Sequence, residues 1–218
     1  MNFIIYIFLF FISLFILFVL SKHDFVLLRK NISVGQIFDL AAFFVIAALF
    51  FGRIFYIGNS GQFELLSPIK FFYFLKFPGF SFLGFIVSGA AIIYFYFRKT
   101  KALSRIYDIF TLSFFPILIA SVVIFNYSVF SIELSLVLLV ILVGLFMSFL
   151  HSHSKYFMRD GGIALLTSSL FSFHTFLIEF FEKGYRIIFF SFVQWISLII
   201  FITSLGIFFI SLKVFAKK

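Results

Sequence analysis

Long apolar runs, separated by short gaps that hold nearly all of the charged residues, constrain this 218-residue chain more than any other feature. Each run has about the 17–25 residues that a helix needs to cross about 30 Å of hydrocarbon. No face of a run is polar, so the runs do not suit the amphipathic helices of a soluble protein. We therefore expect an all-α integral membrane protein, a bundle of about seven transmembrane helices that forms one polytopic domain over residues 1–218. The seven runs cover residues 3–20, 36–57, 80–97, 109–125, 134–150, 163–181 and 187–212.

Lys and Arg are distributed unequally between alternate gaps. Twelve of the seventeen follow the first, third and fifth runs or lie in the C-terminal tail: Lys22, Arg29, Lys30, Arg98, Lys99, Lys101, Arg105, Lys155, Arg159, Lys213, Lys217 and Lys218. The opposite side has only Lys70, Lys76, Lys183 and Arg186, and Arg53 lies within the second run. Cytoplasmic loops of membrane proteins carry an excess of Lys and Arg. We therefore expect the N-terminus outside and the C-terminus in the cytoplasm.

Composition excludes several functional classes. The net charge of +9 reflects basic inner loops beside an anionic leaflet, so we expect no nucleic-acid partner. The chain has no Cys, which excludes disulfides, thiolate nucleophiles and thiolate metal ligands within it. The first run lacks a basic segment before it and a small-residue cleavage site after it, so we expect a retained helix. The longest gap, residues 58–79, contains an apolar stretch at 71–75 that predicts a helix on the outer surface.

Polar residues within or beside the runs are the candidate functional groups, because ionisable side chains in hydrocarbon are costly and are usually functional. With the expected topology, six of them lie in the outer half of the bundle: Arg53, Ser81, Asn126, Glu133, Glu179 and Gln194. One interpretation is a site open to the outer leaflet. The alternative is that each is an interface residue that snorkels to the headgroups or caps a helix.

Two further histidines lie close together after the fifth run, at His151 and His153. They have no third ligand and no carboxylate at a usual metal-site spacing, so we expect solvated loop residues and no metal. The sequence also shows no Gly-rich phosphate loop, serine triad or pair of catalytic carboxylates, and we expect no cofactor.

Several segments share their order and spacing with one known family. The longest is residues 79–108, with Ser81-Phe82, Gly84 and Tyr107-Asp108-Ile109. The others are residues 51–56, Gly161-Gly162, residues 177–181 and Gln194 ahead of Ile196-Ser197-Leu198. Through these segments the chain resembles bacterial prolipoprotein diacylglyceryl transferases over most of its length.

The resemblance implies an enzyme of the bacterial plasma membrane that takes a diacylglyceryl group from phosphatidylglycerol. The acceptor would be the lipobox cysteine thiol of a preprolipoprotein signal peptide, and glycerol phosphate would be released. Such a reaction needs cations for the donor phosphate and assistance in deprotonating the thiol. By this resemblance, the catalytic residues would be Glu179, Asn126 and Glu133. The substrate would be bound by Arg53, Ser81 and Gln194, and by His174 as one of the groups that could replace a lost arginine.

Three positions depart from the family. Leu83 replaces a histidine, while Val123 and Thr175 replace arginines. Two functional classes therefore remain open: a diacylglyceryl transferase whose phosphate site uses other cations, and a catalytically degenerate homologue that binds lipid or peptide. A small transporter is a third alternative, disfavoured because no intramembrane charge pair spans both halves of the bundle.

Overall fold

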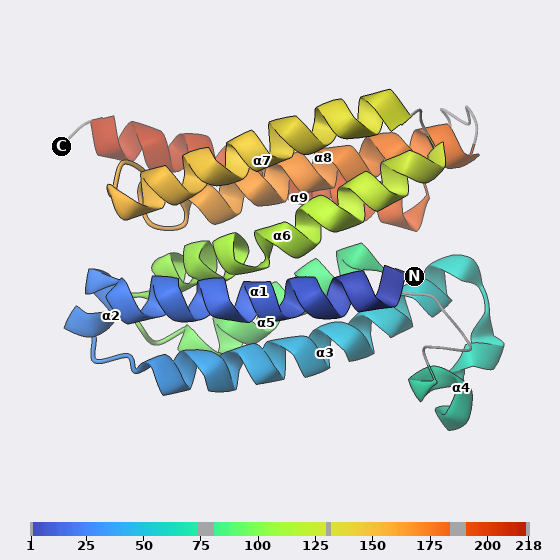
Figure 1. The fold of residues 1–218 in the computed structure, drawn as a ribbon, viewed down its shortest axis with the longest axis horizontal. Helices are drawn as coiled ribbons and strands as arrows, with labels where there is room; N and C mark the ends of the chain where they lie inside the picture. The colour runs from blue at the N-terminus through green and yellow to red at the C-terminus, as the bar shows by residue number, and fades with distance from the viewer. Residues whose placement is uncertain (1, 74–80, 130–131, 184–190, 217–218) are drawn as a thin grey trace.

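The computed structural model describes residues 2–73, 81–129, 132–183 and 191–216, and it is helical throughout these ranges, without a strand (Figure 1). Three short elements are α2 (Phe25–Arg29), the 3-10 helix η1 (Phe63–Leu66) and α4 (Pro68–Phe72). The long helices are α1 (Asn2–His23), α3 (Val34–Ser60), α5 (Phe82–Phe97), α6 (Leu103–Val129), α7 (Ile132–Ser154), α8 (Gly162–Lys183) and α9 (Phe192–Ala216).

Each predicted apolar run coincides with one of the long helices. Local signals in the sequence fix several helix ends. Ser33 and Gln36 form a capping box at the start of α3, and Gly61 ends this helix with a positive φ of 69°. Pro116 lies inside α6, where it removes one backbone hydrogen bond, and Figure 1 shows this helix changing direction near its middle.

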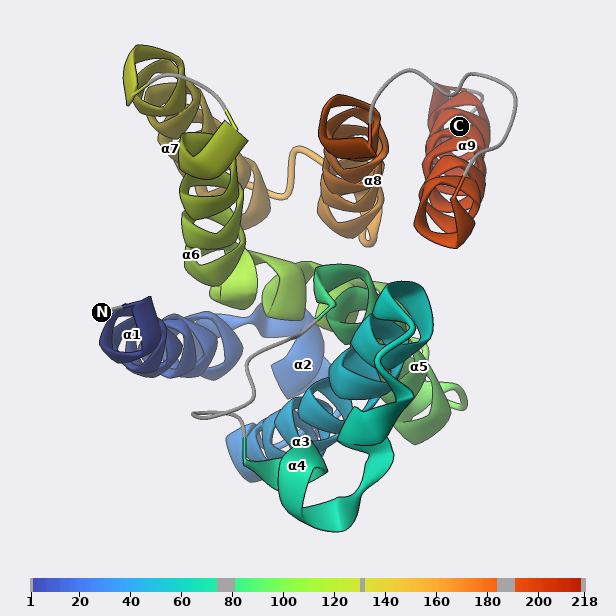
Figure 2. The same ribbon diagram turned by 90° about the vertical axis from the view of Figure 1, so that its right-hand side faces the viewer.

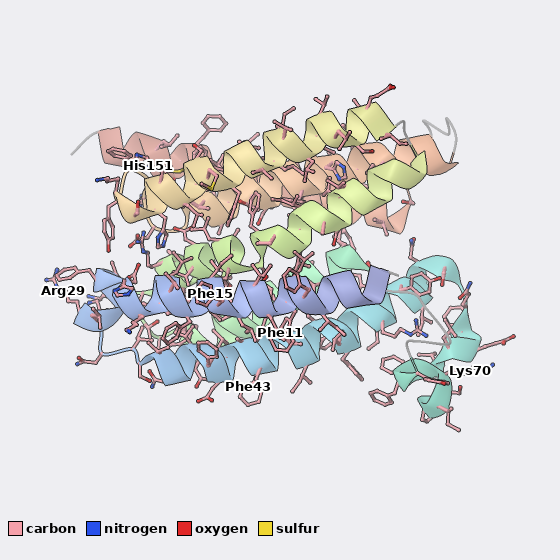
Figure 3. All side chains as sticks on the ribbon, in the orientation of Figure 1. Phe11, Phe15, Arg29, Phe43, Lys70 and His151 are labelled. Carbon is pink, nitrogen blue, oxygen red and sulfur yellow. The ribbon has the colours of Figure 1, made fainter. Side chains whose placement is uncertain are left out.

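The described helices are those of a multi-pass membrane protein. Four are long and apolar enough to cross a membrane: Val34–Ser60, Leu103–Val123, Ile132–Ser154 and Val193–Leu212. Three shorter apolar helices accompany them, at Ile7–His23, Leu83–Phe97 and Gly162–Ile178. Large apolar side chains cover the outside of the bundle, and Figure 3 shows Phe11, Phe15 and Phe43 exposed on α1 and α3. An apolar surface of this extent suits contact with lipid rather than with water.

The helices form two groups on either side of α6 (Figures 1 and 2). In the first group α3 packs on α5 and α1 packs along α6. The buried side chains of Leu17, Ile37, Ile93 and Ile106 join these four helices in one core. In the second group α8 packs on α9, and α6 contacts both α7 and α8. The core of this group is built around Phe115 of α6.

Glycines allow α3 and α5 to approach closely. A Cβ atom at Gly84 would lie 2.8 Å from Cβ of Phe55 and 3.0 Å from Cα of Gly52. A Cβ atom at Gly89 would overlap the ring of Phe44. Small residues at such crossings are typical of membrane helices, because association there depends on close packing.

Successive long helices run in opposite directions and define two ends of the bundle. We call the end with residues 21–33, 98–102 and 155–161 the basic end; Arg29 and His151 lie there in Figure 3. The opposite end, which we call the far end, carries Lys70 and α4.

The segment expected to hold a surface helix at residues 71–75 has a different structure. The helix begins earlier, at Pro68, and ends at Phe72, and it follows η1; residues 74 and 75 lie outside the described part. Pro68 explains the earlier start, since proline is favoured in the first turn of a helix. Leu65 and Phe71 are buried against Ile57 of α3, whereas Ile69 is exposed.

Candidate functional site

Arg53 lies at the far end, in the last third of α3, and is fully buried (0% exposed). Its guanidinium Nη2 donates a hydrogen bond of 3.2 Å to the backbone carbonyl of Lys70, and its Cζ lies 5.9 Å from the centre of the Tyr56 ring. The hydrogen bond to Lys70 attaches α4 to α3, while Tyr56 lies on α3 itself. In this arrangement the guanidinium supports the fold of the far end.

Ser81 and Gln194, expected to bind substrate, both cap helices at the far end. The hydroxyl of Ser81 accepts a hydrogen bond from the backbone N–H of Gly84 at the start of α5, and its own N–H donates to the carbonyl of Gly52. The side-chain amide oxygen of Gln194 accepts a hydrogen bond of 2.7 Å from the backbone N–H of Ser191. The hydroxyl of Ser191 accepts one in turn from the backbone N–H of Gln194. This reciprocal pair is a capping box at the start of α9. The structure thus brings Ser81 against Gly52, the residue before Arg53, at the contact of α3 with α5, whereas Gln194 bonds within its own turn.

The other expected site residues lie on separate helices. Glu133 is exposed in the first turn of α7, where a carboxylate is favoured by the helix dipole. His174 is half-buried on α8, and the hydroxyl of Thr175 beside it donates to the carbonyl of Phe171. Asn126 and Glu179 belong to the far ends of α6 and α8, but their side chains lie outside the described part.

A buried network of charged groups occupies the basic end instead. At its centre is Arg105, near the start of α6, which is 2% exposed. Its Nε lies 2.7 Å from Oδ2 of Asp24, and its Nη1 lies 3.5 Å from Oδ1 of Asp160. Nη2 donates to the carbonyl of His153 at 3.2 Å, and the ring of Tyr156 covers the guanidinium at 4.4 Å. One arginine therefore joins the turn between α1 and α2 to α6, α7 and the loop 155–161.

The carboxylates of the basic end also hold backbone N–H groups. Asp24 caps α2 by accepting from the N–H groups of Val26 and Leu27. Asp108 of α6 accepts bonds of 2.6 Å and 2.8 Å from the N–H groups of Gly161 and Ala164 at the start of α8. A carboxylate at a helix N-terminus bonds N–H groups that have no partner within the helix and is stabilised by the helix dipole. These bonds fix α8 on α6.

One expectation from the sequence was wrong here. His153, predicted to be a solvated loop residue, is 4% exposed, and its Nε2 lies 3.8 Å from Oδ2 of Asp24. It is buried because α7 continues to Ser154 and the loop after it folds back over Arg105. His151 is exposed, as predicted.

From the sequence, Arg105 is expected only to be one of the basic loop residues, and its buried contacts with Asp24, His153 and Asp160 are not predicted. A signal was present, because Asp24, Asp108 and Asp160 lie in or beside gaps that are otherwise basic. An acidic residue in such a gap indicates a specific partner rather than a solvated loop. Within the described ranges, no group of three or more metal-binding side chains is gathered that could hold a metal ion.

A cavity of about 630 Å³ opens beside this network, between α5 and α6 on one side and α8 and α9 on the other. Its volume lies within the range of about 300–1,000 Å³ that is usual for small-molecule sites. Polar groups gather at the basic end, where Arg159, Asp160, Ser104 and Ser211 line what we call the mouth. The interior is apolar and includes side chains of Phe85, Phe110, Phe114, Leu118, Phe171 and Ile207.

Three hydroxyl side chains, those of Thr111, Thr167 and Ser168, interrupt this apolar lining. Thr167 of α8 lines the cavity and is 3% exposed. Its hydroxyl has no hydrogen-bond partner among the described residues. A buried hydroxyl without a partner is uncommon and calls for an explanation. The polar mouth and the mainly apolar interior together suit a ligand with a long apolar part and a polar head.

Comparisons with known proteins identify no relative: no family model matches the chain, and neither the curated proteins nor the solved structures contain a match.

Proposed function

We propose that this multi-pass membrane protein binds a phospholipid in the cavity between α5, α6, α8 and α9. The observation that carries the proposal is the division of the cavity into an apolar interior and a polar mouth at one end. This is the polarity of a phospholipid, whose acyl chain is apolar and whose headgroup is polar. The proposal keeps the lipid-binding alternative that the sequence left open, but it moves the site from the outer half of the bundle to the basic end.

The proposed topology places the mouth at the level of lipid headgroups. All seven long helices would cross a bacterial plasma membrane, with the N-terminus outside and the basic end in the cytoplasm. The cavity extends along α6 from Ser104 to Leu118, which is roughly 21 Å at 1.5 Å per residue. One leaflet of hydrocarbon is about 15 Å deep. An acyl chain from the inner leaflet therefore fits along the cavity with its headgroup at the mouth.

Water is a poor alternative occupant of the interior. A buried water molecule needs two to four polar partners. Below the mouth the walls are mainly aromatic and aliphatic, and the hydroxyl groups there are those of Thr111 on α6 and of Thr167 and Ser168 on α8. An acyl chain needs no polar partner and gains dispersion contacts with the aromatic walls.

Photolabelling in bilayers tests the proposal. A phospholipid with a diazirine group in one acyl chain should label peptides of α5, α6 and α8 that line the cavity. Thr167→Trp should abolish most of this labelling, because the indole would fill the interior. Leu136→Trp is the matched control, since it introduces the same indole side chain on the exposed face of α7. Equal labelling of the cavity peptides in wild type and Thr167→Trp would refute lipid binding in the cavity.

A diacylglyceryl transferase is the second candidate. It is favoured by the bond of Ser81 to Gly52, the residue before Arg53, on two closely packed helices at the far end. In this proposal phosphatidylglycerol and a preprolipoprotein signal peptide would be the substrates. Glu179, Asn126 and Glu133 would act in catalysis, and Arg53, Ser81, Gln194 and His174 would bind substrate. The buried state of Arg53 and the capping roles of Ser81 and Gln194 make this candidate the weaker one.

Activity in phosphatidylglycerol bilayers separates the two candidates. If the protein only binds lipid, a lipobox peptide incubated with it should acquire no diacylglyceryl group. Transfer by the wild-type protein that is lost in Arg53→Lys, with the amount of folded protein unchanged, would establish the transferase instead. Arg29→Lys is the matched control, because it makes the same change at an exposed position of the basic end.

A further inference from the structure

We infer that the mouth of the cavity selects an aminophospholipid, whose phosphate binds Arg159 and whose primary ammonium group binds Asp160. The inference rests on the proposed function and adds the class of headgroup to it. It begins from the two opposite charges that line the mouth side by side. A headgroup with a phosphate and a primary amine carries the two complementary charges, a negative one for Arg159 and a positive one for Asp160.

Arg159 is held in place for such a contact. Its Nη1 donates a hydrogen bond of 3.3 Å to the backbone carbonyl of Ser211, so the side chain reaches from the loop 155–161 to α9. A guanidinium has five N–H donors, and one such bond leaves donors for phosphate oxygens. Its planar shape suits bidentate binding of a phosphate.

Asp160 supplies the complementary charge. Its side chain is 40% exposed, so the carboxylate is accessible from the mouth. It shares Arg105 with Asp24, and the shorter of the two distances, 2.7 Å against 3.5 Å, belongs to Asp24. One guanidinium thus serves two carboxylates, and the longer, weaker contact is that of Asp160. An ammonium group of the ligand would give this carboxylate a closer cation once Arg159 binds the phosphate.

The same geometry disfavours an anionic headgroup without an amine. The phosphate of phosphatidylglycerol could bind Arg159, but its glycerol group would bring no further cation to Asp160, which would keep only the 3.5 Å contact with Arg105. The many basic residues of this end attract anionic lipids over longer distances, yet such attraction between exposed charges is largely screened beyond about 8 Å at physiological salt. Contacts at the mouth therefore decide the preference. Phosphatidylcholine is intermediate, because its quaternary ammonium is a cation but has no N–H group to donate.

The wild-type protein in nanodiscs provides the test. Unlabelled phosphatidylethanolamine, phosphatidylcholine and phosphatidylglycerol would each compete with the diazirine phospholipid for the cavity peptides. We expect phosphatidylethanolamine to compete about tenfold better than phosphatidylglycerol, the effect of one charge-assisted hydrogen bond. Asp160→Asn should remove the preference, and Arg159→Gln should weaken all three phospholipids. Lys155→Gln is the control, because it removes a charge from the same loop at an exposed position that does not line the cavity.

The outcomes separate this inference from the proposed function. Equal competition by the three lipids, with labelling still blocked by Thr167→Trp, would overturn the headgroup selection and leave lipid binding intact. Labelling that Thr167→Trp does not reduce would overturn both. Because the lipid comparison uses the wild-type protein, it decides the inference even if Asp160→Asn weakens the contact with Arg105 and destabilises the fold.

Discussion

Replacing Arg105 with methionine should destabilise the protein by about 3 kcal/mol. The change removes the guanidinium that contacts Asp24, His153 and Asp160, while keeping an apolar side chain beside Tyr156. Breaking a buried ion pair by removing one partner costs about 3–5 kcal/mol, because the other charge is left buried. Asp24 retains two backbone N–H donors, so we expect the lower end of this range.

The free energy of unfolding can be measured by titration with sodium dodecyl sulfate in mixed micelles, followed by far-ultraviolet circular dichroism. Arg29→Met is the matched control at the same end of the bundle, and we expect it to change stability by less than about 0.5 kcal/mol because Arg29 is exposed. Asp24→Asn combined with Arg105→Met should cost less than the sum of the two single changes. The reasoning is refuted if Arg105→Met is no more destabilising than Arg29→Met.

Three further predictions concern packing, topology and pH. Gly89→Ala should destabilise the contact of α3 with α5 by about 1–3 kcal/mol in the same titration, whereas Gly144→Ala, which has nothing within 4 Å, should not. Reporter domains fused after Lys218 should report the cytoplasm and those inserted at residues 59–78 the outside; the reverse would invert the proposed leaflet. Burial raises the pKa of Asp160, as does Asp24, while Arg105 and Arg159 act to lower it. On acidification the proposed preference for an aminophospholipid should therefore be lost at a higher pH than an ordinary aspartate would give, and a preference that persists after Asp160 is protonated would contradict its role.

Hydropathy was sufficient to locate the seven long helices described above, but not α2, η1 or the bounds of α4. The apolar runs agree with the long helices because a helix in hydrocarbon must satisfy its own backbone hydrogen bonds, and this requirement depends only on local sequence. The pairing of α3 with α5 and of α8 with α9 was not predicted. The pairing depends on the shapes of the packed faces, such as the space that Gly89 leaves for Phe44. Hydropathy does not reveal these faces, because lipid-facing and buried positions are both apolar.

The sequence was less informative about the site. Ser81 was selected as a substrate-binding residue by resemblance, but its position before an apolar run is also that of a helix cap, which is what the structure shows. The partners of Arg105 could not be found locally, because Asp24, His153 and Asp160 are separated from it by 81, 48 and 55 residues. The cavity depends on how two groups of helices meet, and no single segment encodes it.

The network around Arg105 also has a consequence for biosynthesis. The chain emerges from the ribosome N-terminus first, so Asp24 is available when Arg105 appears, whereas His153 and Asp160 are made later. Until then Asp24 is the carboxylate available to Arg105. The arginine side chain must therefore remain at the aqueous surface or pair with Asp24 alone. Completion of the loop 155–161 therefore completes the contacts of Arg105 in one late step, and the start of α8 then bonds to Asp108. A ribosome-bound chain halted before residue 153 would lack the contacts that bury Arg105.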